Sequence, residues 1–491
     1  MNKQVKRVAI IGAGPAGLTA AYLLGKAGGF NVQVFEKDAQ YVGGISRTEH
    51  YKGYYFDIGG HRFFSKSQEV EDFWTEILGD ELLERPRSSS IYYNHKLFSY
   101  PLVAGEALRK LGLLEAGLCV LSYLQSRMFP IKNPANFEEW VSNQFGGRLF
   151  RIFFKTYTEK VWGIPCTQIS ADWAAQRIKG LSLSSAIWNA VFPRRKQHKQ
   201  GPIIKTLIDS FRYPKFGPGQ MWETCKAKAE ALGVVVGMNQ PITQLFYHQD
   251  KHQWQIGHQN SWVEGEFDYV ICSAPLRQLV GGIKNPLSLA VRDAAQGLAY
   301  RDFITVVLML KDQHRFNENW IYIHDPNVKV GRVQNFKSWS PYMVPDKEMA
   351  CYGLEYFCFE GDGLWNSSDA DLVALGTSEM VTLGLIDGGM VLDSYVVRQP
   401  KAYPVYNQEY QTHIETIKRG LQPFEGLILT GRNGMHKYNN QDHSMMTAML
   451  AVKNIVAGEM KYDLWKVNQD AEYHEDGELA NAGGRSIPTS V

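Results

Sequence analysis

Several features that mark special classes of protein are missing from this sequence. Lys and Arg total 52 against 50 Asp and Glu, so the formal net charge is only +2, and this balance lacks the strong positive field that nucleic-acid binding requires. No stretch reaches the roughly 20 apolar residues of a membrane-spanning helix. We therefore expect neither a nucleic-acid partner nor a transmembrane segment.

Cysteine patterns and an export signal are also missing. The six cysteines are scattered, with no C-x-x-C pair and no nearby histidine cluster, so neither a disulfide framework nor a metal site is indicated. The N-terminal residues pass directly from polar into strand-like sequence, which leaves no room for a signal peptide. These absences predict a cytoplasmic protein without a bound metal. The cysteines are Cys119, Cys166, Cys225, Cys272, Cys351 and Cys358.

Residues 111–128 form the most apolar later stretch. Glu115, Ser122 and Gln125 interrupt it, which favours a packed helix. A helix on a membrane surface is the alternative, and it would need a basic, aromatic-edged face.

The composition that remains is that of an ordinary globular protein. With 491 residues, 44% hydrophobic and 21% charged, the chain is long enough for two or three cores. Residues 8–11 and 32–35 are typical of buried parallel strands, and residues 15–26 of the helix between them. This pattern predicts a βαβ unit at the start of an α/β fold.

The chain divides into three expected domains. Residues 1–97, 213–290 and 418–462 are predicted to form one discontinuous Rossmann-type nucleotide-binding domain. Residues 98–212 are predicted to form an inserted, mostly helical domain, and residues 291–417 an antiparallel sheet that faces the substrate. Within the insertion, the basic stretch 192–205 is expected to be an exposed loop, either a solvated connector or a contact for an acidic surface. Residues 466–491 are expected to be a loosely ordered tail.

The βαβ unit contains the glycine pattern Gly12-Ala13-Gly14-Pro15-Ala16-Gly17. Three glycines at this spacing permit a tight turn, close backbone approach to a pyrophosphate and close packing of helix on strand. The helix N-terminus supplies amide donors for the phosphates. Glu36, at the end of the second strand, is positioned to accept ribose hydroxyls. A dinucleotide is therefore the expected cofactor.

Two further glycine pairs, Gly43-Gly44 and Gly59-Gly60 followed by His61, resemble those of amine-oxidase-type flavoproteins. The resemblance implies that the dinucleotide is FAD and that Arg47 and the Gly59-Gly60 backbone lie along it. The cofactor contacts expected on this basis are Gly12, Gly14, Ala16, Gly17, Glu36, Lys37, Gly43, Gly44, Ser46, Arg47, Gly59, Gly60, His61, Ile242, Gly431, Arg432, Asn440, Gln441 and Ser444.

Within these flavoproteins the chain most resembles the UDP-galactopyranose mutases, particularly the longer eukaryotic type. The matching stretches are residues 59–65, 100–101, 160–165, 320–322, 431–434 and 440–444. The resemblance implies a redox-neutral interconversion of pyranose and furanose rings in a nucleotide sugar, with N5 of reduced FAD as the nucleophile. It also implies an external reductant for the flavin and is compatible with a homo-oligomer.

The resemblance assigns substrate residues as well. Arg177 and Arg332 would bind the diphosphate, because guanidinium groups form paired hydrogen bonds with phosphate oxygens. Tyr100, Tyr322, Tyr438, Trp162 and Asn440 would line the sugar pocket, and His61 would reach the N5/O4 edge of the flavin. The structural alternatives are ion pairs for the arginines and packing for the tyrosines. Residues 441–444 open a helix whose N-terminus would face the flavin, with Asp442 or Ser444 as an alternative helix cap.

Two readings of the chemistry remain open. Thr158-Glu159 differ from the Asn-Phe-type pair usual beside the sugar in this family, so another nucleotide-linked hexose or deoxysugar is an alternative substrate. A true oxidase or desaturase of the amine-oxidase superfamily is the alternative reaction, because it would share every cofactor motif.

Overall fold

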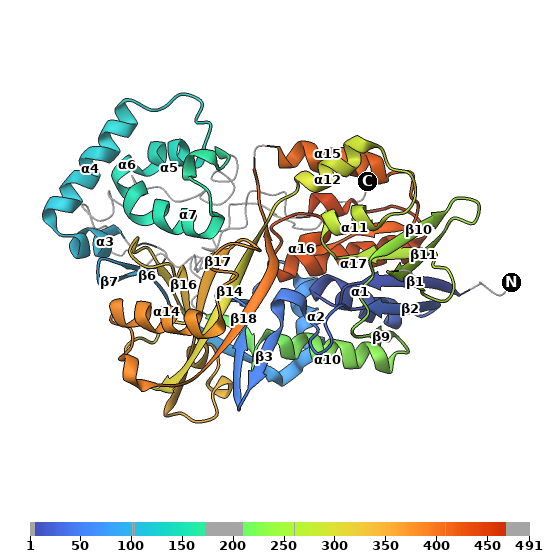
Figure 1. Ribbon diagram of the computed structural model, residues 1–491, viewed down its shortest axis with the longest axis horizontal. Coiled ribbons are helices and arrows are strands. Elements are labelled where there is room, and N and C mark those ends of the chain that lie inside the picture. The colour runs from blue at the N-terminus through green and yellow to red at the C-terminus, as the bar shows by residue number, and fades with distance from the viewer. Residues whose placement is uncertain are drawn as a thin grey trace, which may run out of the picture.

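The computed structural model describes residues 5–100, 102, 104–171, 210–259, 261–407 and 409–467. Arg177, the basic stretch 192–205 and the tail beyond residue 467 lie outside these residues. Two large sheets organise the described part of the chain. Figure 1 shows the parallel sheet at one end of the molecule and a group of short helices at the other, with the second sheet between them.

The first sheet is parallel and carries the nucleotide motif. Its strand order is β19 (Leu427–Leu429), β13 (Tyr269–Cys272), β1 (Lys6–Ile11), β2 (Phe30–Phe35) and β9 (Val235–Gly237). Helices α1 (Pro15–Ala27), α10 (Pro218–Ala231) and α17 (Gln441–Ala457) share one apolar core with it. The expected βαβ unit is confirmed within two residues at each boundary. The other face of this sheet packs against a second core, which includes residues of β10 (Gln244–His248), β11 (Gln253–His258), α11 (Leu276–Gly282), α12 (Leu289–Gly297) and α15 (Tyr410–Leu421). The strands are therefore covered on both faces and read as continuous hydrophobic runs.

The second sheet has seven strands and is mostly antiparallel. Its order is β18 (Val391–Pro404), β14 (Tyr300–Lys311), β17 (Met349–Cys358), β16 (Arg332–Asn335), β15 (Trp320–Ile323), β6 (Ser89–Tyr93) and β7 (Lys96–Ser99). Only the pair β15–β6 is parallel. The expected domain boundary at residue 97 falls inside β7. It is wrong because the hairpin formed by β6 and β7 belongs to the second sheet. Strands β6 and β7 extend this sheet because β6 hydrogen-bonds to β15, a partner more than 200 residues away that local sequence patterns do not reveal.

The expected helical insertion begins after β7. It contains α3 (Ala104–Leu111), α4 (Leu113–Met128), α5 (Phe137–Phe145), α6 (Gly147–Phe150) and α7 (Thr156–Trp162). Helices α5, α6 and α7 share a small core of their own, whereas Ala107 of α3 and Cys119 of α4 belong to the core that includes the second sheet. The packed helix expected over residues 111–128 is correct for one side of α4, which buries Cys119 and Tyr123. Its other side is exposed.

Shorter elements connect these parts. The strand pair β5 (Leu82–Pro86) and β8 (Ser210–Pro214) brings together the two chain segments that flank the insertion. No helix among the described residues is long and apolar enough to cross a membrane. The remaining main elements are β3 (Thr48–Tyr51), β4 (Tyr54–Asp57), α2 (Gln68–Leu78), β12 (Ser261–Trp262), α13 (Phe336–Trp339), α14 (Asp369–Thr382) and α16 (Gly431–Gly434).

Candidate active site

The glycine loop after β1 leaves no room for side chains where it turns into α1. A Cβ on Gly17 would lie 1.9 Å from the carbonyl oxygen of Gly12, and a Cβ on Gly12 would lie 2.5 Å from Ser273 Oγ. Gly12 also has a positive φ of 97°, which favours glycine. Gly14 is different, because a Cβ there would meet only Gly44 Cα at 4.0 Å. The space beside Gly14 is therefore free for a ligand at the N-terminus of α1.

Glu36 fixes the same loop. Its carboxylate accepts hydrogen bonds from the backbone amides of Ala13 at 2.7 Å and Asp38 at 2.9 Å. The side chain is buried, yet it still lines the cavity described next. Each carboxylate oxygen accepts more than one hydrogen bond, so Glu36 retains the capacity to bind ribose hydroxyls.

A cavity of about 540 Å³ runs along the carboxyl ends of β1, β2 and β13. This edge of a parallel sheet is where nucleotides bind in doubly wound folds, and the volume is in the range of small-molecule sites. Sequence reasoning missed several residues that also line it, among them Tyr41, Ser273, Gln278, Gln399 and Asn439. Of the residues expected to contact the cofactor, those that line it are Gly12, Gly14, Ala16, Glu36, Lys37, Gly44, Ser46, Arg47, His61, Ile242, Gly431, Arg432, Gln441 and Ser444.

Arg47 is held at the wall of this cavity by two side chains. Its Nε and Nη2 donate to Glu49 Oε1 at 3.1 and 3.0 Å, and Nη1 donates to Gln399 Oε1 at 2.7 Å. Gln399 belongs to β18, so Arg47 links the segment after Gly43-Gly44 to the second sheet. Gly43 connects this segment to the first glycine loop, because its amide donates to Ala13 O at 2.8 Å.

A second, smaller cavity of about 100 Å³ adjoins the first. Three residues, His61, Arg432 and Gln441, line both cavities, so the two spaces are neighbours. The smaller cavity is also lined by Gly59, Gly60, Arg332, Tyr403, Tyr438, Asn440 and Asp442. The polar groups assigned to the flavin edge and to the diphosphate thus lie next to the inner end of the nucleotide cavity.

His61 is neutral in this cavity. Burial, together with the positive charges of Arg432 and Arg332, lowers the pKa of His61 to about 3. Its Nδ1 is buried and has no hydrogen-bond partner among the described residues, as is also true of Gln441 Oε1. Buried polar atoms in proteins normally have partners, so these two atoms at the cavity wall are available to hydrogen-bond a ligand.

Arg332 is held in place by a buried carboxylate. Its guanidinium donates to Glu355 Oε2 from Nε and Nη2, and Gln334 Nε2 donates to the other oxygen of Glu355. Arg332 and Glu355 lie directly opposite each other on β16 and β17. Burial works against the charge of Arg332, but Glu355 and the nearby tyrosines Tyr157, Tyr403 and Tyr322 together outweigh it and raise the pKa of Arg332 well above its usual value. The guanidinium is therefore charged and fixed.

Arg432 contributes a second positive charge. Its Nε donates to Asn439 O at 2.8 Å and its Nη1 to Ala402 O at 3.0 Å. The guanidinium lies over the rings of Tyr403 and Tyr438, which are stacked at 5.5 Å. Within the part of the chain that the structure describes, its hydrogen bonds are made to carbonyl groups, so its charge, unlike that of Arg332, is not matched there by a bonded carboxylate.

The N-terminus of α17 adds a positive dipole end to the cavity. Asn440 caps this helix, with its side chain and that of His443 forming a reciprocal capping box. The alternative caps, Asp442 and Ser444, are therefore wrong, because Asn440 is the residue with the extended backbone that precedes the first turn. The positive end of the helix dipole favours negative charge at this position.

The remaining expected substrate residues fall into two groups near Arg332. Tyr322 lies opposite Arg332 in the β15–β16 pair, and its ring is 5.0 Å from Tyr100. Trp162 lies 6.1 Å from the ring of Tyr438, but it belongs to the core of the helical group and is not among the residues that line the small cavity. Sequence reasoning missed Tyr157, whose ring is 5.1 Å from Tyr322.

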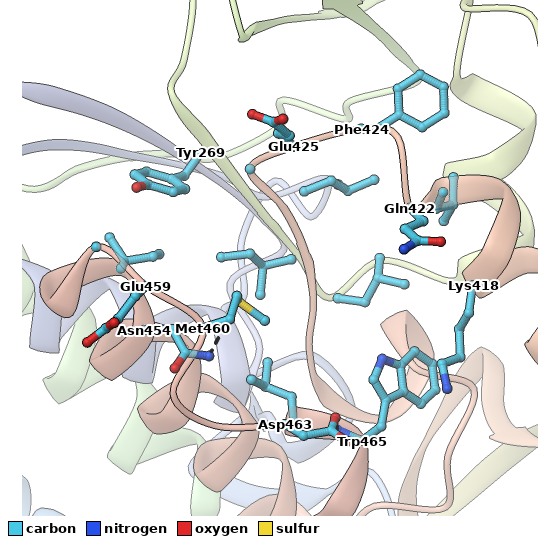
Figure 2. Close-up of a pocket in the computed structure, with 18 residues that line it drawn as sticks. Tyr269, Lys418, Gln422, Phe424, Glu425, Asn454, Glu459, Met460, Asp463 and Trp465 are labelled. Atoms are coloured by element: carbon cyan, nitrogen blue, oxygen red, sulfur yellow. Dashed lines mark hydrogen bonds between the residues drawn. The ribbon is translucent and has the colours of Figure 1, made fainter. Parts of the chain in front are cut away.

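A larger cavity of about 690 Å³ lies elsewhere, between α15, β19 and the end of α17. Figure 2 shows Asn454, Met460, Lys418 and Trp465 along its walls. It is lined by Tyr269 and Leu427, which begin β13 and β19, so it lies at the amino ends of these strands. The side chain of Asn454 already forms hydrogen bonds with Met460, Lys461 and Tyr462. None of the residues expected to contact the cofactor or the substrate lines this cavity.

Comparison with known proteins agrees with this architecture. A family model described as an NAD(P)-binding Rossmann-like domain matches residues 10–77. Reduced UDP-galactopyranose mutase superposes with a TM-score of 0.81 and 22% identity, over 96% of this chain and 99% of that chain. A protein from Exiguobacterium described as a protoporphyrinogen oxidase gives 0.69 and 16%, over 92% and 99%. Putrescine oxidase bound to putrescine gives 0.61 and 16%, over 92% and 99%. The expected α/β fold, with a Rossmann-like domain and an antiparallel-rich sheet, is thereby confirmed.

Proposed function

We propose that this protein is an FAD-dependent mutase that interconverts the pyranose and furanose forms of UDP-galactose or a related nucleotide sugar. The observation that carries the proposal is the fixed, charged Arg332 beside Arg432 and neutral His61, next to the inner end of a dinucleotide cavity. The guanidinium group of Arg332 and several tyrosines at this position suit a diphosphate, while Arg432 suits the cofactor edge.

The described residues fit FAD. The space beside Gly14 and the N-terminus of α1 would receive the pyrophosphate, and Glu36 would accept the ribose hydroxyls. The partnerless Nδ1 of His61 and Oε1 of Gln441 would face the ring system. When bound in its reduced form, FAD supplies a nucleophilic ring nitrogen for the anomeric carbon of the sugar.

The protein's own residues would then bind and orient the substrate and compensate its negative charge. Arg332, with Arg177, would bind the diphosphate and stabilise the negative charge that develops as its bond to the sugar breaks. Tyr322 and Tyr438 would orient the substrate, and Arg432 with the α17 N-terminus would favour the electron-rich side of the reduced cofactor. His61, which stays neutral, would hydrogen-bond at the reacting edge without adding charge.

The alternative is an oxidase or desaturase of the same fold. An apolar or cationic substrate would gain nothing from the positive charge of Arg432 or from the Arg332 nitrogen that Glu355 leaves for another acceptor, and leaving the charge of Arg432 unmatched is costly. The mutase proposal includes an external reductant, a cytoplasmic location and a homo-oligomer. The six cysteines are buried and free, as is usual for proteins of a reducing compartment. The test is turnover of a nucleotide sugar by the reduced protein without net oxidation. Consumption of oxygen with an amine or apolar substrate would favour the alternative.

A further inference from the structure

Helix α4 exposes a mostly apolar surface, in which Gln125 is the polar exception. Leu113 is 95% exposed and Leu114 82% exposed, and the surface extends beyond the helix end through Phe129. With 3.6 residues per turn, the helical members fall on one side of α4. We call this surface the α4 face; it consists of Leu113, Leu114, Leu118, Leu121, Leu124, Met128, Phe129 and Ile131.

The opposite side of α4 fixes the helix in this orientation. Cys119 and Tyr123 are buried there. Glu115 accepts two hydrogen bonds from Arg148, at 2.5 and 2.7 Å, and Ser122 Oγ accepts one from the Arg148 amide at 3.1 Å. A large exposed apolar patch on a folded protein marks an interaction surface.

Within residues 104–136, the charged side chains that are exposed are all cations. Arg109, Arg127 and Lys132 are exposed at its border. The carboxylates of the same region are neutralised, because Glu106 is paired with Lys110 and Glu115 with Arg148. An apolar face bordered by cations complements the surface of a bilayer that contains anionic lipids.

We propose that the α4 face docks on an anionic lipid bilayer, with α4 lying in the plane of the interface. Its apolar side chains would enter the boundary between headgroups and acyl chains, and the three cations would contact lipid phosphates. A second copy of the chain fits less well, because a two-fold axis pairs a surface with itself and would bring the same cations together. The parallel sheet that carries the nucleotide cavity is at the opposite end of the molecule from α4 (Figure 1).

Sedimentation with vesicles tests this proposal, which does not depend on the proposed reaction. The full chain is mixed with vesicles of phosphatidylcholine alone or with phosphatidylglycerol added. The test variant is Leu114→Ser/Leu121→Ser/Met128→Ser. The matched control is Leu289→Ser/Leu392→Ser/Val456→Ser, which changes three exposed apolar side chains elsewhere. Unchanged melting temperatures establish that the variants are folded.

We expect the wild type and the control variant to bind anionic vesicles and the α4 variant to remain in the supernatant. Each Lys or Arg near an anionic surface strengthens binding roughly fivefold, so Arg127→Glu/Lys132→Glu should weaken binding by at least about 25-fold. Absence of wild-type binding to anionic vesicles would overturn the proposal. So would equal binding by the α4 variant, or a dimer in sedimentation velocity that dissociates in this variant while the wild type ignores vesicles.

Discussion

Arg332 Nε and Nη2 both donate to a single oxygen of Glu355, at 2.9 and 2.6 Å. Glu355 is fully buried, and Gln334 Nε2 donates to its other oxygen at 2.9 Å. Gln334 is in turn fixed by Trp339 Nε1, which donates to its Oε1 at 3.0 Å. The position of the guanidinium is therefore set by a chain of buried hydrogen bonds, and Nη1 is the nitrogen that Glu355 leaves for another acceptor.

Substitutions in the Arg332–Glu355 pair should change folding stability and catalytic activity by different amounts. Arg332→Ala leaves the Glu355 carboxylate buried without its partner, which should lower the free energy of unfolding by about 3–5 kcal/mol. Adding Glu355→Gln removes the buried charge and should restore most of that loss while activity stays absent. Urea unfolding and kcat/KM measure the two effects. Equal unfolding of the single and double variants would show that the pair is not the source of the destabilisation.

Replacing the guanidinium fork by a point charge should affect the substrate alone. Arg332→Lys keeps a cation opposite Glu355 but loses paired hydrogen bonding, so we expect kcat/KM to fall by about 100-fold with FAD content unchanged. Arg177→Ala should likewise weaken substrate binding and turnover without FAD loss. FAD content is read from the visible absorbance of purified protein. Loss of FAD from both variants would contradict their assignment to the diphosphate.

Gly14→Ala should weaken FAD binding without unfolding the protein. The added Cβ meets only Gly44 Cα at 4.0 Å within the chain, and the backbone of Gly14, with φ of −80°, suits alanine. The methyl group would instead occupy the space assigned to the pyrophosphate, which should raise the Kd for FAD at least about tenfold. Fluorescence titration of the apoprotein measures this.

The matched control for that experiment is Gly105→Ala. Gly105 lies in helix α3, and a Cβ there would have no neighbour within 4 Å. It should leave the affinity for FAD unchanged. Wild-type affinity in the Gly14 variant would place the pyrophosphate elsewhere.

Folding stability should decrease as the pH falls from 6.5 to 4. Burial lowers the pKa of His61 and His324 to about 3 and of His436 to about 4. In this range the unfolded chain therefore binds protons that the folded protein excludes, at about 1.4 kcal/mol per pH unit for each histidine. Burial also raises the pKa of Asp57 to about 7, which acts in the opposite direction, because folded Asp57 stays protonated. Among the groups with large pKa shifts in this pH range, the three histidines outweigh the one carboxyl group.

His324→Phe checks this origin. The phenyl ring preserves the stack on Tyr157 but does not titrate, so the dependence of unfolding free energy on pH should become shallower by about 1.4 kcal/mol per pH unit. An unchanged slope would assign the acid sensitivity to other groups.

The sequence was most informative where function depends on consecutive residues. The glycine patterns identified the nucleotide loop because a side chain at these positions would collide with the neighbouring backbone or with the ligand. Sequence reasoning did not identify Glu355, Gln334 and Tyr157. The positions of Glu355 and Gln334 depend on the pairing of β15, β16 and β17, and the position of Tyr157 depends on the packing of α7 against these strands. One signal was present: Glu355 is a lone acid within the otherwise apolar strand β17, and a buried carboxylate needs a partner.

The domain boundary at residue 97 failed for a related reason. Strands β6 and β7 have an ordinary hairpin pattern that fits either sheet, and only the parallel pairing of β6 with β15 assigns them to the second. Local pattern predicts that a strand exists, but it does not identify a partner that is distant in the sequence.

The most direct test of the central claim is anaerobic incubation of dithionite-reduced protein with UDP-galactofuranose, followed by chromatography, with oxidised protein in parallel. The proposed function predicts conversion to UDP-galactopyranose by the reduced protein only. Absence of conversion in the reduced sample, with UDP-galactofuranose and with other nucleotide sugars, would contradict the mutase assignment.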